Sequence, residues 1–343
     1  MIRILTDSAS DILPAEAEQL GVTVIPLNVT LEDGIVLRDG IDMTPSAYYD
    51  HLASCRKLPT TSQPSPELFE KFYLEAAAAG DEVLGIFLSH ELSGTWQCAK
   101  LAADLANVDN VLFVDSANVC LGEALLVRLA VQLRDAGKTL VQIATALEHA
   151  KEHLHLVAAI DDLKYLRKGG RLPAAVAVAG GMLGIKPLIT IKEGKVAMAG
   201  KARGLPGAYV ALFKKIDELG GISPDFATVA GYSASLREVQ PIQNYFRDTL
   251  DLPEPLVRQI GCVIGTHAGP GAFGLAFFDK GLVLEYATTE KRSSDQSRAA
   301  LRAARLVFLL GATNSLSQNL TVLPAPSGRE PLARPALTAL RPR

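Results

Sequence analysis

Cysteine, tryptophan and long apolar runs are scarce in this chain of 343 residues, which has four cysteines and one tryptophan. No two cysteines have metal-binding or redox spacing, so we expect the reduced thiols of a cytoplasmic protein and no metal site. The longest weakly polar run, 174–185, is shorter than the roughly 20 residues of a membrane span. No basic stretch leads into an apolar one at the start, so no secretory signal is expected.

Acidic residues prevail over most of the chain. Residues 283–343 contain nine Lys and Arg against four Asp and Glu. Residues 1–282 therefore contain 25 Lys and Arg against 33 Asp and Glu. A nucleic-acid-binding core needs a basic surface, so the acidic body argues against a nucleic-acid partner. The hydrophobic content of 48% allows a large core, and the length suggests two domains.

Strand-like and helix-like segments alternate through the first half of the chain. The apolar runs 2–5, 83–88 and 111–114 are typical of buried strands. The segments 95–106 and 123–136 are typical of helices. This alternation predicts an α/β fold with a mainly parallel sheet that helices cover on both faces.

A second α/β domain is expected to begin near residue 156. A hairpin is predicted at 187–199 and a strand region at 256–265. Further helices are predicted at 141–154, 174–185 and 235–250. The expected division is an N-terminal α/β domain, a C-terminal α/β domain and a basic extension that is part helix and part flexible, spanning 1–155, 156–282 and 283–343 respectively.

The extension contains one predicted helix. Ser294 is placed to cap a helix that runs to Leu310 and carries three arginines on one face. Such a helix can lie on a membrane surface, and it can equally pack onto the protein. Transient membrane contact is therefore among the expected interactions.

Ser93 and Gly94 lie where the strand 83–88 turns into the helix that begins at Thr95. Free backbone N–H groups and the positive end of the helix dipole meet at such a point. Ser93 offers a hydroxyl donor, and Gly94 has no Cβ to block a close approach. The sequence therefore predicts an anion site here.

Two further features carry polar groups. The loop 59–66, rich in prolines and hydroxyls, is stiff enough to present Thr61 and Ser62 at a fixed geometry. A glycine-rich turn is expected to hold His267 in place. Hydroxyls, a free N–H and one imidazole suit a carboxylate or a phosphate without cleaving it. These features favour binding over hydrolysis.

Ser93 and His267 nevertheless leave open a serine hydrolase, with Ser93 as nucleophile and His267 as base. The nucleophile elbow G-x-S-x-G requires glycine at two positions where this chain has Glu91 and Thr95. No acid is evident as the third member. A purely structural α/β protein with an empty domain junction is the remaining alternative.

Two other motifs are weak. His149 and His153 have the spacing of metal ligands on a helix, but Ala150 stands where a metalloprotease has glutamate. Residues 269–274 match a dinucleotide fingerprint formally, although little chain follows to build its βαβ unit. We expect a solvated helix end and a tight turn, respectively.

Several short motifs follow one another along residues 1–280: Thr6-Asp7-Ser8 with Asp11, Thr61-Ser62-Gln63-Pro64-Ser65, Leu92-Ser93-Gly94-Thr95, Asp115-Ser116, Tyr165-Leu166, Gly169-Gly170-Arg171, Lys186-Pro187, Lys201-Ala202-Arg203-Gly204, and His267 with Gly269-Pro270-Gly271. In this order they resemble the DegV family, bacterial fatty-acid-binding proteins that act as carrier subunits of fatty acid kinase. The turn at His90 and Glu91 is bulkier and more charged than the family pattern, and the extension has no counterpart.

The resemblance implies two α/β domains with a ligand tunnel at their junction, which would hold a long-chain fatty acid. The residues that it implies for the fatty acid carboxylate are Thr61, Ser62, Ser93, Gly94 and His267. It further implies that Arg171 and Arg203 serve the head-group phosphate of the product or the docking of a partner.

The resemblance also implies that this protein has no catalytic residues and no cofactor of its own. A separate ATP-binding fatty acid kinase subunit, related to dihydroxyacetone kinases, would phosphorylate the bound acid. The carrier would then deliver acyl phosphate to phospholipid synthesis.

Overall fold

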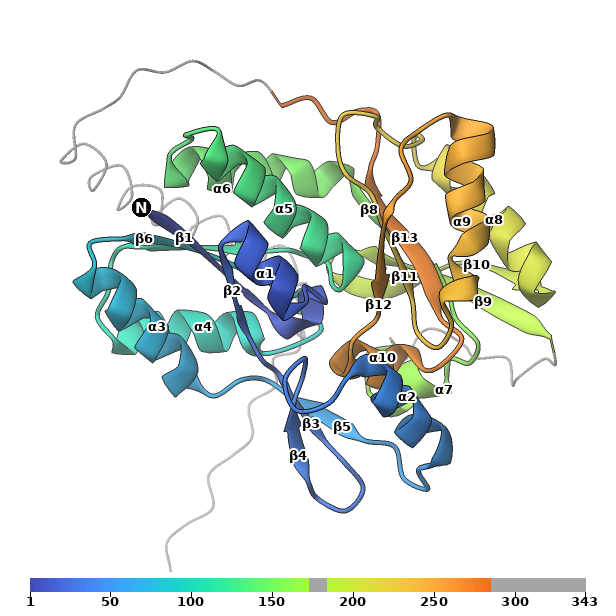
Figure 1. The fold of residues 1–343 in the computed structure, drawn as a ribbon, viewed down its shortest axis with the longest axis horizontal. Helices are drawn as coiled ribbons and strands as arrows, with labels where there is room; N and C mark the ends of the chain where they lie inside the picture. Colours follow the sequence, from blue (N-terminus) through green and yellow to red (C-terminus); the bar gives the residue numbers. More distant parts are fainter. Residues whose placement is uncertain (173–183, 285–343) are drawn as a thin grey trace, which may run out of the picture. The chain divides into compact units, whose positions relative to one another are not determined.

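The computed structural model describes residues 1–172 and 184–284, which belong to one compact unit, Met1–Leu301. Their strands form a four-stranded, a six-stranded and a three-stranded sheet (Figure 1). The predicted α/β fold is confirmed, whereas the domain boundaries at 155 and 282 stay a prediction. The helix predicted in the extension lies outside the described residues, as does all but the end of the helix predicted at 174–185.

The four-stranded sheet is parallel throughout and is built from β1 (Ile2–Asp7), β2 (Val22–Ile25), β6 (Glu82–Phe87) and β7 (Val111–Asp115). Its order is β2-β1-β6-β7. The helices around it are α1 (Pro14–Leu20), α3 (Pro66–Ala78), α4 (Thr95–Leu105), α5 (Leu121–Asp135) and α6 (Leu140–Ala150). In Figure 1, α3 and α4 cover one face and α5 and α6 the other, as the alternation predicts.

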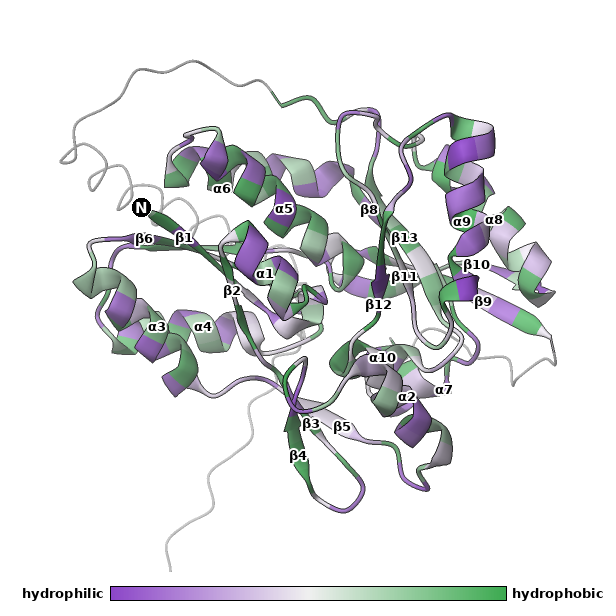
Figure 2. Cartoon of the chain, in the orientation of Figure 1, coloured by the Kyte–Doolittle hydropathy of each residue, from purple (hydrophilic) through white to green (hydrophobic). Residues whose placement is uncertain are grey.

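The six-stranded sheet is built from β8 (Leu154–Ala159), β9 (Ile185–Lys192), β10 (Lys195–Arg203), β11 (Val229–Tyr232), β12 (Leu256–Gln259) and β13 (Phe273–Phe278). Its order is β10-β9-β8-β13-β11-β12, and its neighbours are antiparallel except β11 and β12. Against it pack α8 (Gly204–Glu218) and α9 (Gln240–Tyr245). Both helices combine hydrophilic and hydrophobic residues (Figure 2), as half-exposed helices do.

Helix α5 lies between these two sheets and contacts strands of both, β1 and β6 on one side and β8, β11 and β13 on the other. Eleven of its fifteen residues are buried. A helix that is apolar on nearly every side is one that other elements enclose. Helix α5 is therefore the element through which the two sheets share a core.

The small antiparallel sheet is built from β3 (Asn28–Thr30), β4 (Val36–Arg38) and β5 (Thr60–Ser62). Nearby helices are α2 (Pro45–Ser54), α7 (Lys164–Lys168) and α10 (Cys262–Ala268). Tyr48 and Leu52 of α2 pack in one buried cluster with Tyr165 of α7 and Val263 of α10. Segments far apart in the sequence thus meet beside β5.

The structure corrects the prediction of a strand at 256–265. Strand β12 ends at Gln259, and α10 begins at Cys262. His267 therefore lies in the last turn of a helix rather than in a glycine turn, and Gly269 (φ 74°) ends that helix. A short apolar run suits a buried helix as well as a strand, and here the packing of α10 against α2 decides.

Strand β13 is absent from the sequence-based prediction, although it lies in the interior of the six-stranded sheet. Its neighbours β8 and β11 are both antiparallel to it. An antiparallel strand needs no crossover helix, so the short segment that follows α10 is long enough to form β13. The segment 60–62, predicted as loop, is strand β5 because it pairs with β3.

Two predicted helices have different ends. The helix predicted at 141–154 stops at Ala150, a 3₁₀ turn η2 (Lys151–His153) follows, and Leu154 pairs with Phe278 in the sheet. The helix predicted at 235–250 is instead three shorter elements: the 3₁₀ turn η3 (Leu236–Glu238), helix α9 and the π-helical turn η4 (Phe246–Leu250). Pro241 lies at the start of α9 and has no backbone N–H. It therefore cannot donate the hydrogen bond that would continue a helix from η3 into α9.

The carboxyl group of Asp7 is fully buried at the end of β1. It accepts hydrogen bonds from the backbone N–H groups of Ala9 (2.8 Å) and Leu88 (3.0 Å). Asp7 therefore joins the end of β1 to the segment that leads from β6 to Ser93. Burial raises the pKa of Asp7 to about 7, because the loss of solvation outweighs these two hydrogen bonds.

This raised pKa predicts a contribution to stability that depends on pH. Between its unfolded pKa near 4 and its folded pKa near 7, Asp7 binds a proton only in the folded state. Its contribution is thus present below the unfolded pKa and is lost as the pH rises through about 7, by up to about 4 kcal/mol.

We expect Asp7→Asn to reduce the loss of unfolding free energy that the protein shows between pH 5 and pH 8, as measured by urea denaturation. The exposed Asp50 on α2 provides the matched control, Asp50→Asn. Parallel pH profiles for the protein and Asp7→Asn would contradict the burial argument.

Candidate functional site

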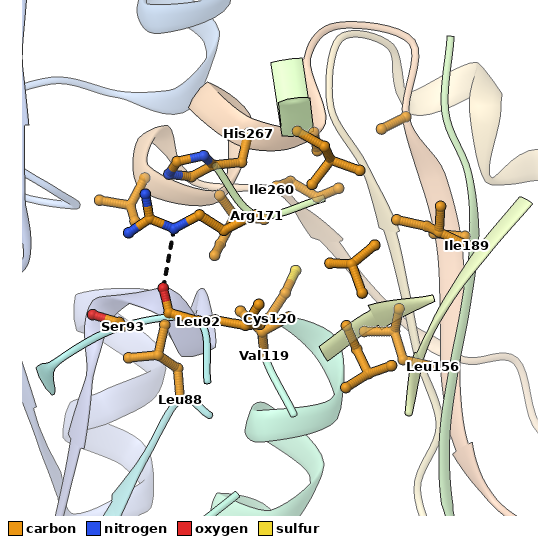
Figure 3. Close-up of a pocket in the computed structure, with 18 of the residues that line it drawn as sticks. Leu88, Leu92, Ser93, Val119, Cys120, Leu156, Arg171, Ile189, Ile260 and His267 are labelled. Carbon is orange, nitrogen blue, oxygen red and sulfur yellow. Dashed lines mark hydrogen bonds between the residues drawn. The ribbon is translucent and has the colours of Figure 1, made fainter. Parts of the chain in front are cut away.

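An apolar cavity lies where the β6–α4 turn, the start of α5, strands β8, β9, β10 and β13, and helix α10 come together. Figure 3 shows Leu156 and Ile189 at one side of it and Ser93, Arg171 and His267 at the other. The apolar lining residues include Leu27, Leu88, Leu92, Val119, Leu121, Leu156, Ile189, Ile191, Val196, Ile260 and Val263. The cavity is therefore amphipathic, with long apolar walls and a polar end.

Thr61 and His267 meet at the polar end, although they are 206 positions apart. The hydroxyl oxygen of Thr61 lies 2.9 Å from Nε2 of His267, within hydrogen-bond distance. Thr61 is held there by the pairing of β5 with β3, in which it lies opposite Val29. His267 is held by α10. Ser62, the next residue of β5, also lines the cavity.

Ser93 reaches the same cavity from the turn that leads into α4. Its hydroxyl lies 2.9 Å from that of Thr95 and accepts a hydrogen bond from the N–H of Thr95 (3.3 Å). Gly94 is the N-cap residue of α4 but is not among the residues that line the cavity. The predicted strand–turn–helix geometry at Ser93 is thus present, and Ser93 lines the cavity.

His267 is neutral at physiological pH. Enclosure by protein, and to a smaller degree the charge of Arg171, lower the pKa of the imidazole to about 4. Its Nδ1 is buried and has no hydrogen-bond partner within the described ranges. A Cβ on Gly169 would lie only 2.1 Å from this nitrogen, so glycine at 169 leaves the room that the ring occupies.

Arg171 is the one charged side chain among the described residues that line this cavity, since His267 is neutral. It is half-buried and donates to the carbonyl oxygens of Leu92 (3.0 Å, dashed in Figure 3) and Gly169 (2.6 Å). Burial lowers its pKa, but a guanidinium remains charged. With five N–H groups it has donors left for a ligand.

The structure therefore brings together Thr61, Ser62, Ser93, Arg171 and His267, with Gly94 next to them. It does not bring Arg203 there. Arg203 is exposed at the end of β10, opposite Ile185, and does not line the cavity. A role for Arg203 toward the head group would need another molecule that covers this surface.

The geometry does not favour a serine hydrolase. The hydroxyl of Ser93 is paired with Thr95, and Nε2 of His267 is paired with Thr61. Nδ1 of His267 has no carboxylate partner in residues 1–172 and 184–284. A nucleophile needs a base within hydrogen-bond reach and an acid to orient that base, and neither relation exists here.

Sequence reasoning missed two parts of the site. The apolar walls come from strands in both halves of the chain, and a hydrophobic strand residue that lines a cavity carries the same pattern as one that fills a core. Gln63 also lines the cavity, and its place in the run Thr61-Ser62-Gln63 was a signal that could have included it.

Two of the histidines outside this site are paired with one aspartate. Nδ1 of His153 and Nε2 of His155 lie 3.0 and 2.7 Å from the two carboxylate oxygens of Asp279, and His149 contacts the ring of His153. Among the described residues, no group of three or more such side chains is placed to hold a metal ion. In the same ranges, no helix has the length and apolar character needed to cross a membrane.

The fold and the cavity together define an α/β protein with an apolar cavity that has one polar end. A family model described as "Uncharacterised protein, DegV family" matches residues 1–280. A DegV domain-containing protein from Deinococcus radiodurans is 37% identical over 282 residues, which are 80% of this chain and 97% of that protein. The chain belongs to the DegV family.

Two solved structures show the same fold. One is a fatty-acid-binding DegV family protein from Thermus thermophilus, with 35% identity and a TM-score of 0.74, over 81% of this chain and 99% of that one. The other is a stearic-acid-binding protein from Eubacterium ventriosum, with 27% identity and a TM-score of 0.74, over 82% and 99%. Fatty acid binding thus occurs among members of this family.

The lowered pKa of His267 predicts a neutral ring at pH 5.5, where an unperturbed histidine is mostly protonated. Because the folded pKa lies below the unfolded one, the contribution of this group to stability is present above about 6.5 and is lost as the pH falls through about 4. Nitrogen-15 NMR of the imidazole groups measures its protonation directly.

The His267→Gln variant identifies the signal by its disappearance. We expect one protonated and one unprotonated ring nitrogen for His267 throughout the range from pH 8 to pH 5.5. A signal that titrates near pH 6.5 would mean that the ring is open to solvent, and it would refute the enclosed geometry.

Proposed function

We propose that this protein binds a long-chain fatty acid, with the carboxylate at the polar end of the cavity and the tail along its apolar walls. The observation that carries the proposal is that three hydroxyls, one arginine, His267 and Gln63 line a cavity whose other walls are mainly apolar. The fatty acid binding of relatives with the same fold supports it.

The protonation state of His267 decides how the carboxylate is held. A neutral ring carries one N–H, and we place it on Nε2, where Thr61 can accept it. The hydroxyl hydrogen of Thr61 is then free to point at the ligand. Ser93 supplies a second hydroxyl, and Arg171 supplies the charge that makes the carboxylate the favoured form.

The apolar walls provide most of the affinity. Burial of each CH₂ group contributes about 0.8 kcal/mol, so a chain of roughly 16 carbons contributes about 12 kcal/mol before the costs of association. A hydrogen bond to a charged group contributes about 1.5–3 kcal/mol. The polar end therefore sets the register of the chain and the orientation of its carboxylate.

An enclosed carboxylate without a nucleophile or a base beside it suits a carrier rather than an enzyme. We propose that a partner, an ATP-dependent fatty acid kinase subunit related to dihydroxyacetone kinases, phosphorylates the bound acid to acyl phosphate for phospholipid synthesis. We further propose a cytoplasmic location, no cofactor, and the division into 1–155, 156–282 and 283–343. The family resemblance and the absence of charges other than Arg171 from the described cavity lining support the proposed role as a carrier.

Titration of the delipidated protein with hexadecanoic acid tests the proposal. Organic extraction of the purified protein, followed by mass spectrometry, first identifies what it already carries. We expect Ser93→Ala to weaken the binding of the acid about tenfold, because one hydrogen bond to a charged group is lost. Its thermal stability should stay close to that of the parent.

The control for Ser93→Ala is Ser54→Ala on α2, an exposed serine outside the cavity. If the parent protein neither releases nor binds a fatty acid, the proposed function is wrong. If the parent binds and Ser93→Ala binds equally well, Ser93 does not contact the carboxylate.

The positive charge of Arg171 leads us to expect that the site prefers head groups with more negative charge. An acyl phosphate carries more negative charge than a carboxylate, so loss of the guanidinium should affect a phosphate head group more. We expect Arg171→Ala to weaken binding of a long-chain alkyl phosphonate about tenfold more than binding of the fatty acid of equal length. Equal losses for the two ligands, with the exposed Arg237→Ala as control, would exclude this role.

A further inference from the structure

Helix α4 begins without a capping side chain of its own. Its N-cap residue is Gly94, which makes no side-chain cap hydrogen bond. An N-cap residue normally supplies a side-chain oxygen to the free N–H groups of the first turn. At this helix start, which is also where Ser93 enters the cavity, the hydroxyl of Ser93 accepts the N–H of Thr95, and the N-cap position itself carries no side chain.

The amide oxygen of Gln63 lies next to Gly94. A Cβ placed on Gly94 would lie 2.1 Å from Oε1 of Gln63, so the amide oxygen occupies the space in which the side chain of an ordinary N-cap residue would lie. The amide belongs to the segment that follows β5. The missing Cβ of Gly94 therefore leaves room for the amide of Gln63 in the position seen here, in addition to the room expected for a ligand.

A second residue of α4 contacts the same segment. Cys98 lies in the first turn of the helix, and its thiol is hydrogen-bonded to the side chain of Gln63. Its Sγ also lies 3.5 Å from the carbonyl oxygen of Pro64. Two independent contacts therefore tie the residues after β5 to the start of α4.

These contacts connect the two halves of the polar end. Thr61 lies two residues before Gln63, and Ser93 lies directly before Gly94. The hydroxyl of Thr61 is bonded to His267 and that of Ser93 to Thr95, so no hydrogen bond among the described residues joins Thr61 to Ser93. The contacts of Gln63 and Pro64 with α4 link the two segments.

We propose that Gln63 is a positioning residue that holds Thr61 and Ser93 at the spacing a single carboxylate requires. This inference rests on the proposed function, since it concerns the same site. Gln63 acts through the backbone of α4 and β5. Its loss should weaken recognition of the head group and leave the hydrophobic contribution of the tail to binding unchanged.

Two variants separate positioning from simple helix capping. Gln63→Ala removes the amide. Gln63→Ala combined with Gly94→Ser gives α4 a cap of its own but leaves the segment after β5 untied. Each is titrated with a fatty acid and with the fatty alcohol of the same chain length. The alcohol fills the same apolar walls without a charge.

Both variants should bind the acid about tenfold more weakly than the parent and the alcohol equally well, because a misplaced hydroxyl loses one hydrogen bond to a charged group. Parental affinity for the acid in Gln63→Ala would overturn the proposal, because Gln63 would then have no part in binding. Parental affinity in the double variant would also overturn it, because the helix cap alone would then explain Gln63. An equal loss for acid and alcohol would also overturn it, because the effect would not be confined to the head group.

Gln19→Ala on α1 is the matched control, since Gln19 is exposed and does not line the cavity. It should bind both ligands like the parent. Failure of the parent protein to bind any fatty acid would refute the proposed function itself. Failure of the positioning proposal would leave parental binding intact.

Discussion

The hydrogen bond between Thr61 and His267 is the contact on which the polar end of the cavity depends. It joins a strand of the first half of the chain to a helix of the second. Because burial lowers the pKa of the imidazole to about 4, the ring is neutral and carries a single N–H. A charged ring would instead act as a second cation beside Arg171 and would change which head groups the site accepts.

The apolar side of the cavity depends on a different constraint. Helix α5 is enclosed between the two larger sheets, and its first residues form part of the cavity wall. Strands β8 and β9 form the opposite wall with Leu156 and Ile189 (Figure 3). The cavity therefore lies within the hydrophobic core of the protein, so an apolar ligand bound there would be buried in the same interior that stabilises the fold.

The hydrophobic pattern predicted the parallel sheet and its helices well, because the apolar runs 83–88 and 111–114 can each be assigned as a buried strand from the local sequence alone. It failed at 262–278, where α10 and β13 are both short and apolar. Periodicity does not separate a buried helical turn from a buried strand at such lengths. Their identity depends on partners distant in sequence, namely α2 for α10 and β8 for β13.

By itself, the sequence determined the α/β class, the strand–turn–helix segment that contains Ser93, and the family, since each depends on local pattern or on motif order. Only the tertiary structure decided that Thr61, Ser93, Arg171 and His267 share one cavity, and that Arg203 does not. It also showed that Gly94 makes room for Gln63. The physical reason is that cavity walls and side-chain contacts arise from packing between distant segments, which no local pattern encodes.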